Sequence, residues 1–206
     1  MFIIGVTGGI GAGKSSFASL LAEAGLPLLD ADQISHEMTK AGGRSMPEIE
    51  ACFGPDYLNP DGSLDRTAMS ALAFRDKKSL DKLSAIIHHD VISTIADRLQ
   101  ALSQTNAQAA VLDVPIPVKH GFLDRCDLVI GLWAEDDLRL ERLEKRGMSR
   151  DEAKRRMAVQ LSREEYEKLS DIFVLNNGSR EDLRQQAQKI LQDELGSRGI
   201  KFQDLV

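Results

Sequence analysis

The chain has few cysteines, few aromatic residues and no long hydrophobic run. Its 206 residues include two cysteines, Cys52 and Cys126, whose separation fits neither a disulfide framework nor a zinc site. No apolar run reaches the roughly 20 residues of a transmembrane helix, and the first residues lack the pattern of a signal peptide. We therefore expect a cytoplasmic protein that has no membrane partner.

An excess of positive charge is also missing. The net charge is −6 at pH 7, which argues against a nucleic-acid-binding protein and leaves room for a local basic patch around a nucleotide. A chain of 206 residues can bury one good core with insertions, but it is too short for two domains of ordinary size. We expect a compact α/β enzyme that acts as a monomer on small molecules.

What the chain does have is a concentration of glycine near its start. Residues 8–15 read Gly-Gly-Ile-Gly-Ala-Gly-Lys-Ser, which fits the phosphate-binding loop pattern. The apolar residues 2–6 predict a buried strand before this loop, and apolar positions at helical spacing after Lys14 predict a helix that ends near Gly25. An ordinary glycine-rich turn is the alternative, but strand, motif and helix agree.

The residue types of this loop suit a triphosphate. Glycines allow consecutive backbone N–H groups to converge on phosphate oxygens, and the N-terminus of the next helix adds further N–H groups and partial positive charge. Lys14 is expected to contact the terminal phosphates, and the Ser15 hydroxyl to ligate Mg²⁺. The residues expected to bind ATP here are Gly9, Gly11, Ala12, Gly13, Lys14, Ser15 and Ser16.

Aspartates follow two further predicted strands. Residues 26–29 predict a short strand that leads into Asp30 and Asp32. Either carboxylate could accept a proton from an attacking hydroxyl or position the metal through water, and helix capping is the alternative. Residues 109–115 predict another strand with Asp113 near its carboxyl end. Asp113 could be a Walker B carboxylate or could satisfy a nearby turn, and the sequence favours neither.

The rest of the chain alternates helices with strands. Residues 33–102 form an interrupted helical pattern, and its long amphipathic segment over 80–102 carries His88 and His89. Adjacent histidines diverge by about 100° on a helix, so a structural or substrate-contacting role is expected rather than a metal site. Strands are predicted over residues 128–133 and 172–175, and helices over 136–146, from 149 to about 160, from 162, and from 180 to about 195.

Arginines crowd the two helices that are predicted to begin near residues 149 and 162. Ser-x-x-Glu patterns at 149–152 and 162–165 predict a capping box at each start. Taken alone, charges of both signs are typical of a solvated surface. In a phosphoryl-transfer enzyme, an arginine-bearing helical pair at this place serves as a lid that excludes water.

Five strands alternating with helices predict a parallel, doubly wound sheet. Six segments carry a further pattern: residues 6–15, Asp30-Ala31-Asp32, His88, Asp113-Val114-Pro115, 156–160 and Asn177-Gly178-Ser179. In order and spacing they resemble the motifs of the dephospho-CoA kinase family, and the resemblance covers nearly the whole chain. It implies an α/β fold of the nucleoside monophosphate kinase type: a P-loop parallel five-stranded sheet flanked by helices, with a helical acceptor-binding insertion and a helical lid.

The resemblance also implies an activity and a division of the chain. The activity is ATP-dependent phosphorylation of the ribose 3′-hydroxyl of dephospho-CoA, which gives CoA in the last step of its biosynthesis, with ATP and Mg²⁺ required. The implied nucleotide-binding core comprises residues 1–32, 103–148 and 170–206. Residues 33–102 would form the helical acceptor domain for CoA, and residues 149–169 the lid.

Roles for single residues follow from the same resemblance. Asp32 matches the catalytic base, and Lys14 and Ser15 match the phosphate and magnesium contacts. Arg142 falls where the family places an arginine near the ATP phosphates, so we expect it to act in catalysis with Asp32 and Lys14. Asn177 falls in the segment beside the adenine.

The acceptor side carries both matches and departures. His88 and Asp113 match positions that line the acceptor site together with Asp32, but His89 stands where the family usually has Pro. Residues 115–119 read Pro-Ile-Pro-Val-Lys, where a Pro-Leu-Leu-Phe-Glu-like run is common. Pro117 and Lys119 therefore differ from the pattern, and Lys119 reverses a charge.

Two further departures lie elsewhere: Asn176 replaces a common Asp, and Tyr166 replaces a common lysine of the lid. Two other functions stay open. One is a kinase of the same fold that acts on another nucleoside or nucleotide. The other is a nucleotide-binding switch that transfers nothing, against which the complete loop and Asp32 argue.

Overall fold

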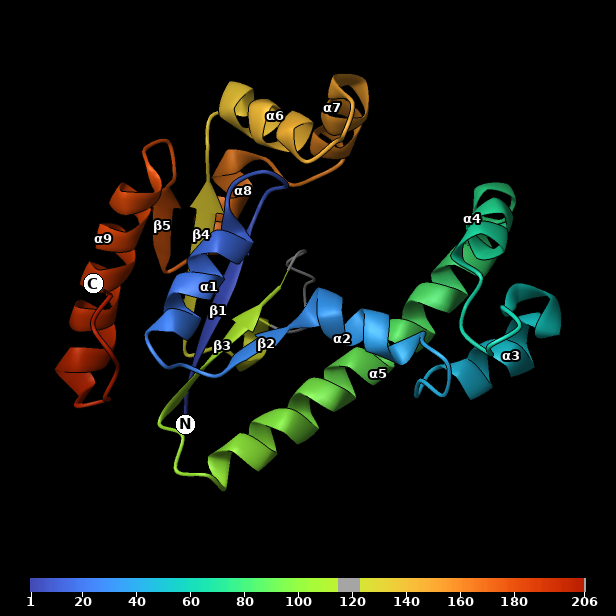
Figure 1. The fold of residues 1–206 in the computed structure, drawn as a ribbon, viewed down its shortest axis with the longest axis horizontal. Helices are drawn as coiled ribbons and strands as arrows, with labels where there is room; N and C mark the ends of the chain where they lie inside the picture. Colours follow the sequence, from blue (N-terminus) through green and yellow to red (C-terminus); the bar gives the residue numbers. More distant parts are fainter. Residues whose placement is uncertain (115–122, 206) are drawn as a thin grey trace. The chain divides into compact units, whose positions relative to one another are not determined.

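The computed structural model describes residues 1–114 and 123–205, and these residues form a parallel five-stranded sheet (Figure 1). Its strands lie in the order β2-β3-β1-β4-β5, and every neighbouring pair runs parallel. The predicted α/β class with a doubly wound parallel sheet is confirmed. The strands are β1 (Phe2–Gly8), β2 (Leu28–Asp30), β3 (Ala109–Asp113), β4 (Leu128–Trp133) and β5 (Ile172–Leu175).

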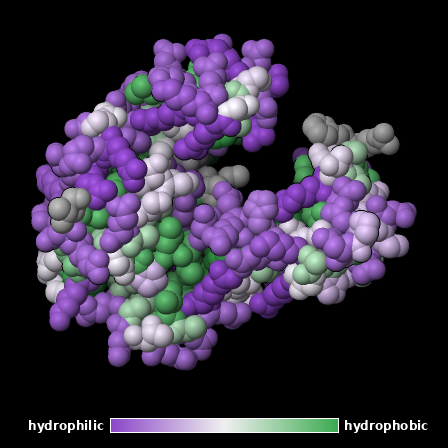
Figure 2. Space-filling model, viewed as in Figure 1, coloured by the Kyte–Doolittle hydropathy of each residue, from purple (hydrophilic) through white to green (hydrophobic). Residues whose placement is uncertain are grey.

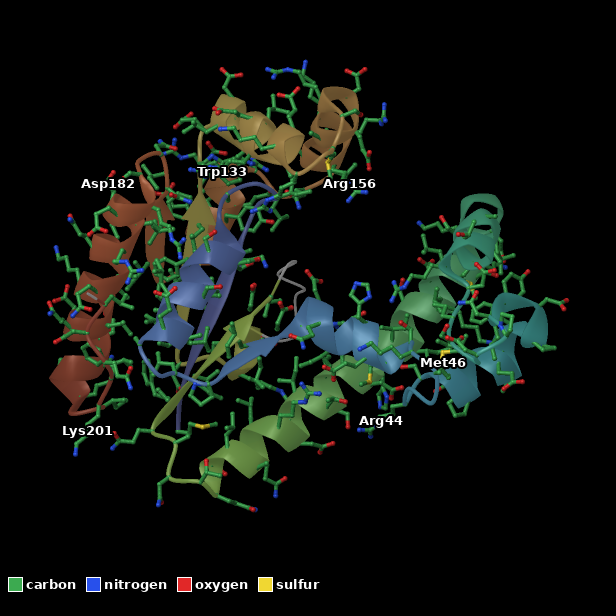
Figure 3. All side chains as sticks on the ribbon, in the orientation of Figure 1. Arg44, Met46, Trp133, Arg156, Asp182 and Lys201 are labelled. Carbon is green, nitrogen blue, oxygen red and sulfur yellow. The ribbon has the colours of Figure 1, made fainter. Side chains whose placement is uncertain are left out.

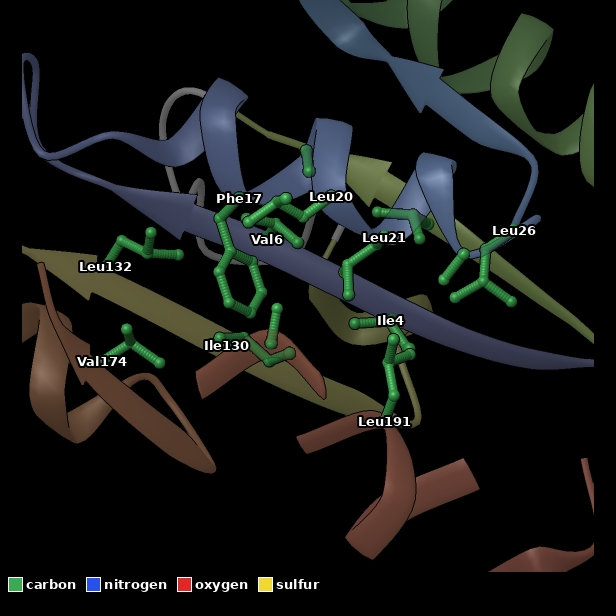
Figure 4. Close-up of a cluster of buried hydrophobic side chains, with 14 of the residues drawn as sticks. Ile4, Val6, Phe17, Leu20, Leu21, Leu26, Ile130, Leu132, Val174 and Leu191 are labelled. Carbon is green, nitrogen blue, oxygen red and sulfur yellow. The ribbon is translucent and has the colours of Figure 1, made fainter. Parts of the chain in front are cut away.

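One face of the sheet is covered by α1 (Lys14–Glu23) and α9 (Arg180–Ile190). The last helix continues as a π-helical turn over Leu191–Leu195 and a short 3₁₀ turn over Gly196–Arg198. Alternate residues of the strands point into this layer, as expected from the two-residue period of a strand. Figure 4 shows the buried side chains Ile4, Val6, Phe17, Leu20, Leu21, Leu26, Ile130, Leu132, Val174 and Leu191.

The other face of β4 carries α8 (Arg163–Lys168). Tyr166 of α8 lies against Trp133, with ring centroids 5.8 Å apart. A Cβ on Gly131 would lie 2.0 Å from the Ser170 hydroxyl oxygen, so only glycine allows this close approach. The chain reaches α8 from β4 through α6 (Asp136–Lys145) and α7 (Arg150–Ala158), and the short turn η2 (Leu123–Arg125) precedes β4.

The chain divides into two compact units, one comprising Met1–Asp30 with Leu102–Val206 and the other Ala31–Ala101. The second unit is helical and has its own apolar cluster around Met46, Ile49 and Ile86. In Figure 2 most of its visible surface is hydrophilic. The acceptor role expected for residues 33–102 stays a prediction. The helices of this unit are α2 (Ala31–Met38), α3 (Met46–Phe53), η1 (Pro55–Tyr57), α4 (Arg66–Arg75) and α5 (Lys77–Ser103).

The residues after the last helix fasten the C-terminal end to the sheet unit. Phe202 packs against the main core, and the N–H of Gln203 donates to the carbonyl of Ala24 at 2.8 Å. The Arg198 guanidinium lies 4.9 Å from the ring centroid of Phe2. The C-terminal segment therefore contacts both the end of α1 and the start of β1.

Strand boundaries differ from those predicted. The second strand was expected at residues 26–29, but β2 starts at Leu28 and includes Asp30, which pairs with Asp113 of β3. Leu26 instead donates its N–H to the Leu21 carbonyl and ends the turn after α1. The strand expected over 109–115 ends at Asp113.

One helix start and one helix cap also differ from those predicted. The long helix expected from residue 80 begins at Lys77, because the Asp76 carboxylate accepts backbone N–H groups at its first turn. The capping box predicted at Ser149 is only half present: Ser149 accepts from the N–H of Glu152, but the Glu152 carboxylate bonds to Arg156. The second predicted box, at Ser162, is complete and is confirmed.

Candidate active site

The phosphate loop joins β1 to α1, as the motif predicts. Gly11 and Gly13 have φ values of 77° and 98°, a region that residues with side chains seldom adopt. Gly13 occupies the position before α1, and no side chain caps the helix there. The first N–H groups of α1 thus remain free of a side-chain cap, which leaves the positive end of the helix available to an anion.

Lys14 and Asp113 form an ion pair at the carboxyl edge of the sheet. The Lys14 Nζ lies 2.5 Å from Asp113 Oδ1, and the two side chains are 13% and 3% exposed. Asp113 pairs in register with Val6 of β1 and Asp30 of β2. Since ligands of open α/β sheets bind at the carboxyl ends of strands, this buried carboxylate stands beside the predicted phosphate site.

The other residues expected to bind ATP differ in their exposure. Ser15 and Ser16 are exposed in the first turn of α1, so their hydroxyls are accessible to a ligand. Ala12 is buried, and its N–H donates to the carbonyl of Gly9 at 3.0 Å. Gly9 and Ala12 therefore contribute to the internal shape of the loop.

Arg142 and Asn176, which lie outside the loop, donate hydrogen bonds to its backbone carbonyls. Arg142 donates to the Asn176 carbonyl at 2.9 Å and to the carbonyls of Gly11 and Ala12 at 3.4 and 3.5 Å. The buried Asn176 side chain donates to the Ala12 carbonyl at 2.8 Å, and a Cβ on Gly13 would lie 2.1 Å from its amide nitrogen. Burial lowers the pKa of Arg142, which still keeps its charge at neutral pH. The predicted arginine is thus next to the loop, whereas Asn176 was noticed only as a departure.

Asn177 ties the end of β5 to the start of α6. Its side-chain oxygen accepts the backbone N–H of Glu135 at 2.9 Å, and Glu135 is the residue before α6. This contact fixes the segment between β5 and α9. The predicted place of Asn177 beside an adenine stays a prediction.

The helical unit contains two of the three residues expected to line the acceptor site, Asp32 and His88, whereas the third, Asp113, lies on β3 of the sheet unit. Asp32 is exposed and lies inside the first turn of α2, so it does not occupy the cap position, and His88 is half-buried on α5. One turn after Asp32, His36 accepts from Arg66 at 3.1 Å, since a guanidinium only donates, and the same Arg66 nitrogen donates to Thr39 at 2.7 Å. The four-residue spacing from Asp32 was the signal that could have pointed to His36.

His89 belongs to a polar cluster. Its Nδ1 lies 3.3 Å from the Asp90 carboxylate, which also accepts from the Ser45 hydroxyl at 2.7 Å.

Across residues 1–114 and 123–205, no three His, Cys, Asp or Glu side chains are grouped to hold a metal ion. The departures at Pro117 and Lys119 lie outside the described residues. Among the helices of the described part of the chain, none has the length and apolar character to span a bilayer.

The parallel sheet leads from its first strand into a glycine-rich phosphate loop, and no side chain caps the helix that follows. This arrangement defines the class of phosphate-loop nucleotide-binding proteins. The family model described as dephospho-CoA kinase matches residues 2–182. The chain belongs to the dephospho-CoA kinase family.

Individual relatives agree with this. The chain is 38% identical to a dephospho-CoA kinase of Corynebacterium glutamicum over 196 residues, which are 95% of this chain and 98% of that protein. It is 35% identical to that of Geobacillus kaustophilus over 189 residues, or 91% and 94% of the two chains. The solved dephospho-CoA kinase from Campylobacter jejuni superposes with a TM-score of 0.73 at 27% identity, covering 96% of this chain and 98% of that one.

Proposed function

We propose that this chain transfers the γ-phosphoryl group of ATP to the ribose 3′-hydroxyl of dephospho-CoA, which gives CoA. The observation that carries the proposal is the family match over residues 2–182 in a chain whose phosphate loop places Lys14 beside the buried Asp113. A kinase for another acceptor has no comparable support. The relatives that match over nearly their full length carry the name dephospho-CoA kinase.

The nucleotide side is proposed to work through the loop and the start of α1. The loop N–H groups and Lys14 bind the phosphates, and Arg142 adds positive charge from α6. Lys14 donates to the Asp113 carboxylate. When Lys14 turns to the phosphates, the Asp113 carboxylate would face the acceptor side or water molecules around a metal.

The donor set fits Mg²⁺. This ion usually keeps several waters and takes one or two protein oxygens in addition to substrate phosphates, so it needs no cluster of three carboxylates. The exposed Ser15 hydroxyl is the proposed ligand. Mg²⁺ supplies charge neutralisation on the phosphate oxygens when it is bound.

Asp32 is the proposed general base. Its exposed carboxylate would accept the proton of the 3′-hydroxyl as that oxygen attacks the γ-phosphorus, and ADP leaves. Phosphoryl transfer depends on positioning and on stabilising charge more than on covalent catalysis. His88 and the helical unit would bind the acceptor, and Asn177 the adenine of ATP.

The remaining parts of the proposal concern the division of the chain. Residues 149–169 act as the lid, residues 33–102 as the acceptor domain and the remainder as the nucleotide-binding core. The enzyme works as a monomer and binds no nucleic acid, in keeping with its net charge of −6.

The test is a coupled assay of ADP release from Mg²⁺–ATP with dephospho-CoA as the acceptor. The product is checked by mass for one added phosphate and for its position on the ribose. We expect ADP release that depends on dephospho-CoA and stops when EDTA removes Mg²⁺. Equal or faster turnover with plain nucleosides or nucleotides would favour the other kinase function. ATP binding without transfer to any acceptor would favour the switch.

A further inference from the structure

Ile10 of the phosphate loop contacts both α6 and α7. Its side chain packs into the apolar cluster of Leu140, Leu143 and Ala153. Leu140 and Leu143 belong to α6 and Ala153 to α7. The position of Ile10 is therefore set by these two helices, in addition to the chain on either side of it.

Both backbone groups of Ile10 are also bonded to side chains from distant parts of the sequence. Its N–H donates to Gln160 Oε1 at 2.7 Å, and its carbonyl accepts from Arg139 Nε at 2.9 Å. Arg139 Nη2 donates to the same Gln160 oxygen at 3.3 Å. The three residues thus form a closed ring of hydrogen bonds.

Arg139 is itself fixed in place. Its side chain is 2% exposed, and Nη1 lies 3.1 Å from an Asp136 oxygen. The guanidinium stands 4.2 Å from the ring centroid of Trp133, the residue labelled at the end of β4 in Figure 3. Burial lowers the pKa of Arg139. Arginine nevertheless keeps its charge. The ring of hydrogen bonds therefore contains a buried cation that lies over the aromatic face of Trp133.

Arg139 leaves no room for a side chain at two glycines of the loop. A Cβ on Gly9 would lie 2.7 Å from Arg139 Nη2, and one on Gly11 would lie 2.9 Å from the Arg139 carbonyl oxygen. The arginine therefore contacts the loop from Gly9 to Gly11. Gln160 comes from the connection between α7 and α8, within the proposed lid.

We propose that Gln160 and Arg139 are positioning residues that fix the phosphate loop for ATP through Ile10, an inference that rests on the proposed kinase function. A glycine-rich loop has many conformations available and loses much entropy when a ligand orders it. A loop held in its binding shape avoids that loss and binds more tightly. The ring uses the N–H of Ile10 and no N–H group of the first turn of α1, which carries no side-chain cap and stays available to phosphates.

The ring requires one oxygen at position 160 that accepts from two donors. Gln160→Glu keeps such an oxygen and adds a charge opposite Arg139, whereas Gln160→Met keeps the length and removes the acceptor. Gln185→Met is the matched control, because Gln185 is an exposed residue of α9 outside the ring. These three variants separate loss of the acceptor from loss of a glutamine.

The experiment measures the dissociation constant of Mg²⁺–ATP by calorimetry, together with KM and kcat. For Gln160→Met we expect ATP to bind about tenfold more weakly, the size expected when buried donors lose their acceptor, with KM for dephospho-CoA unchanged. Gln160→Glu and Gln185→Met should bind ATP as the unaltered protein does. Normal ATP affinity in folded Gln160→Met, or an equal loss in Gln160→Glu, would overturn the proposal.

Arg139→Lys provides an independent test that decides the matter if Gln160→Met does not fold. Lysine keeps the charge but has one donor nitrogen in place of the planar fork, so it cannot reproduce the separate Nε and Nη2 donor positions. ATP affinity should therefore again fall. Trp133 is the only tryptophan of the chain, and its emission should shift when the guanidinium is replaced. Unchanged ATP affinity in this variant would contradict the proposal. If the unaltered protein binds ATP but phosphorylates no acceptor, the proposed function fails, while the ATP affinities still decide the role of the ring.

Discussion

The loop end of the sheet unit and the helical unit differ in how their polar side chains are held. At the loop, charged groups are buried and bonded to one another or to the backbone, as Lys14, Asp113 and Arg139 show. In the helical unit, Asp32 is exposed, and ion pairs such as that of Arg44 with Asp97 lie at the surface. The loop end of the sheet unit thus holds these charged side chains through buried contacts, whereas the proposed base Asp32 is exposed.

We expect the largest effect on activity from a substitution in the helical unit, at the exposed Asp32. Asp32→Asn removes the proposed base, and we expect kcat to fall by about 10²- to 10⁴-fold while the affinity for Mg²⁺–ATP stays the same, because the loop is untouched. Single-turnover assays and calorimetry would measure the two quantities. Asp56→Asn, at another exposed aspartate of the helical unit, is the control. Normal turnover in Asp32→Asn would remove Asp32 from this role.

A second pair of variants asks whether the two units behave separately. Ile49→Ala and Leu21→Ala each empty a fully buried site, one in each unit, and each should cost about 2–5 kcal/mol of local stability. We expect Ile49→Ala to raise KM for dephospho-CoA at unchanged ATP affinity, and Leu21→Ala to weaken ATP binding. Thermal unfolding and calorimetry would check this. Equal loss of ATP affinity in both variants would show that the units are not independent in this respect.

The smallest effect concerns the cysteines, one in each unit. Burial raises the pKa of Cys126 to about 12, so at pH 9 this thiol stays protonated and should react slowly with iodoacetamide. Mass spectrometry should therefore find Cys52 modified first, and denaturant should remove the difference. Faster labelling of Cys126 in the folded protein would contradict this environment.

The raised pKa of Cys126 also makes the stability of the folded protein fall at alkaline pH. The unfolded chain releases the Cys126 proton near an ordinary thiol pKa of about 8.5, whereas the folded chain keeps it up to about 12. The folded state consequently loses stability as the pH rises through this interval. Cys126→Ser should reduce the loss in urea titrations at alkaline pH.

The sequence predicted the parts of the site that depend on neighbouring residues. The loop after β1 and the helix start at Lys14 follow from local glycine chemistry, and both are confirmed. The capping box at Ser149 was wrong because Arg156, one turn along the helix, takes the Glu152 carboxylate. Such competition between two local patterns cannot be settled from spacing.

The parts that were missed depend on contacts between distant residues. Ile10 is hydrogen-bonded to Arg139 and Gln160, which lie 129 and 150 positions away in the sequence. No helical or strand periodicity links residues so far apart. Asn176 was seen only as a substituted residue, although its side chain supports Ala12. The fold was thus predictable from patterns along the chain, whereas the side chains that support the loop come from distant segments that only the folded structure brings together.

The C-terminal segment bears on where a working fragment of this chain can end. The family model stops at residue 182, but Leu183, Ala187, Leu191 and Leu195 complete the core beneath α1, and Gln203 bonds to its last turn. A fragment cut where the family match stops would expose the apolar side of the helix that begins at the phosphate loop. The segment that folds is longer than the segment by which the family is recognised.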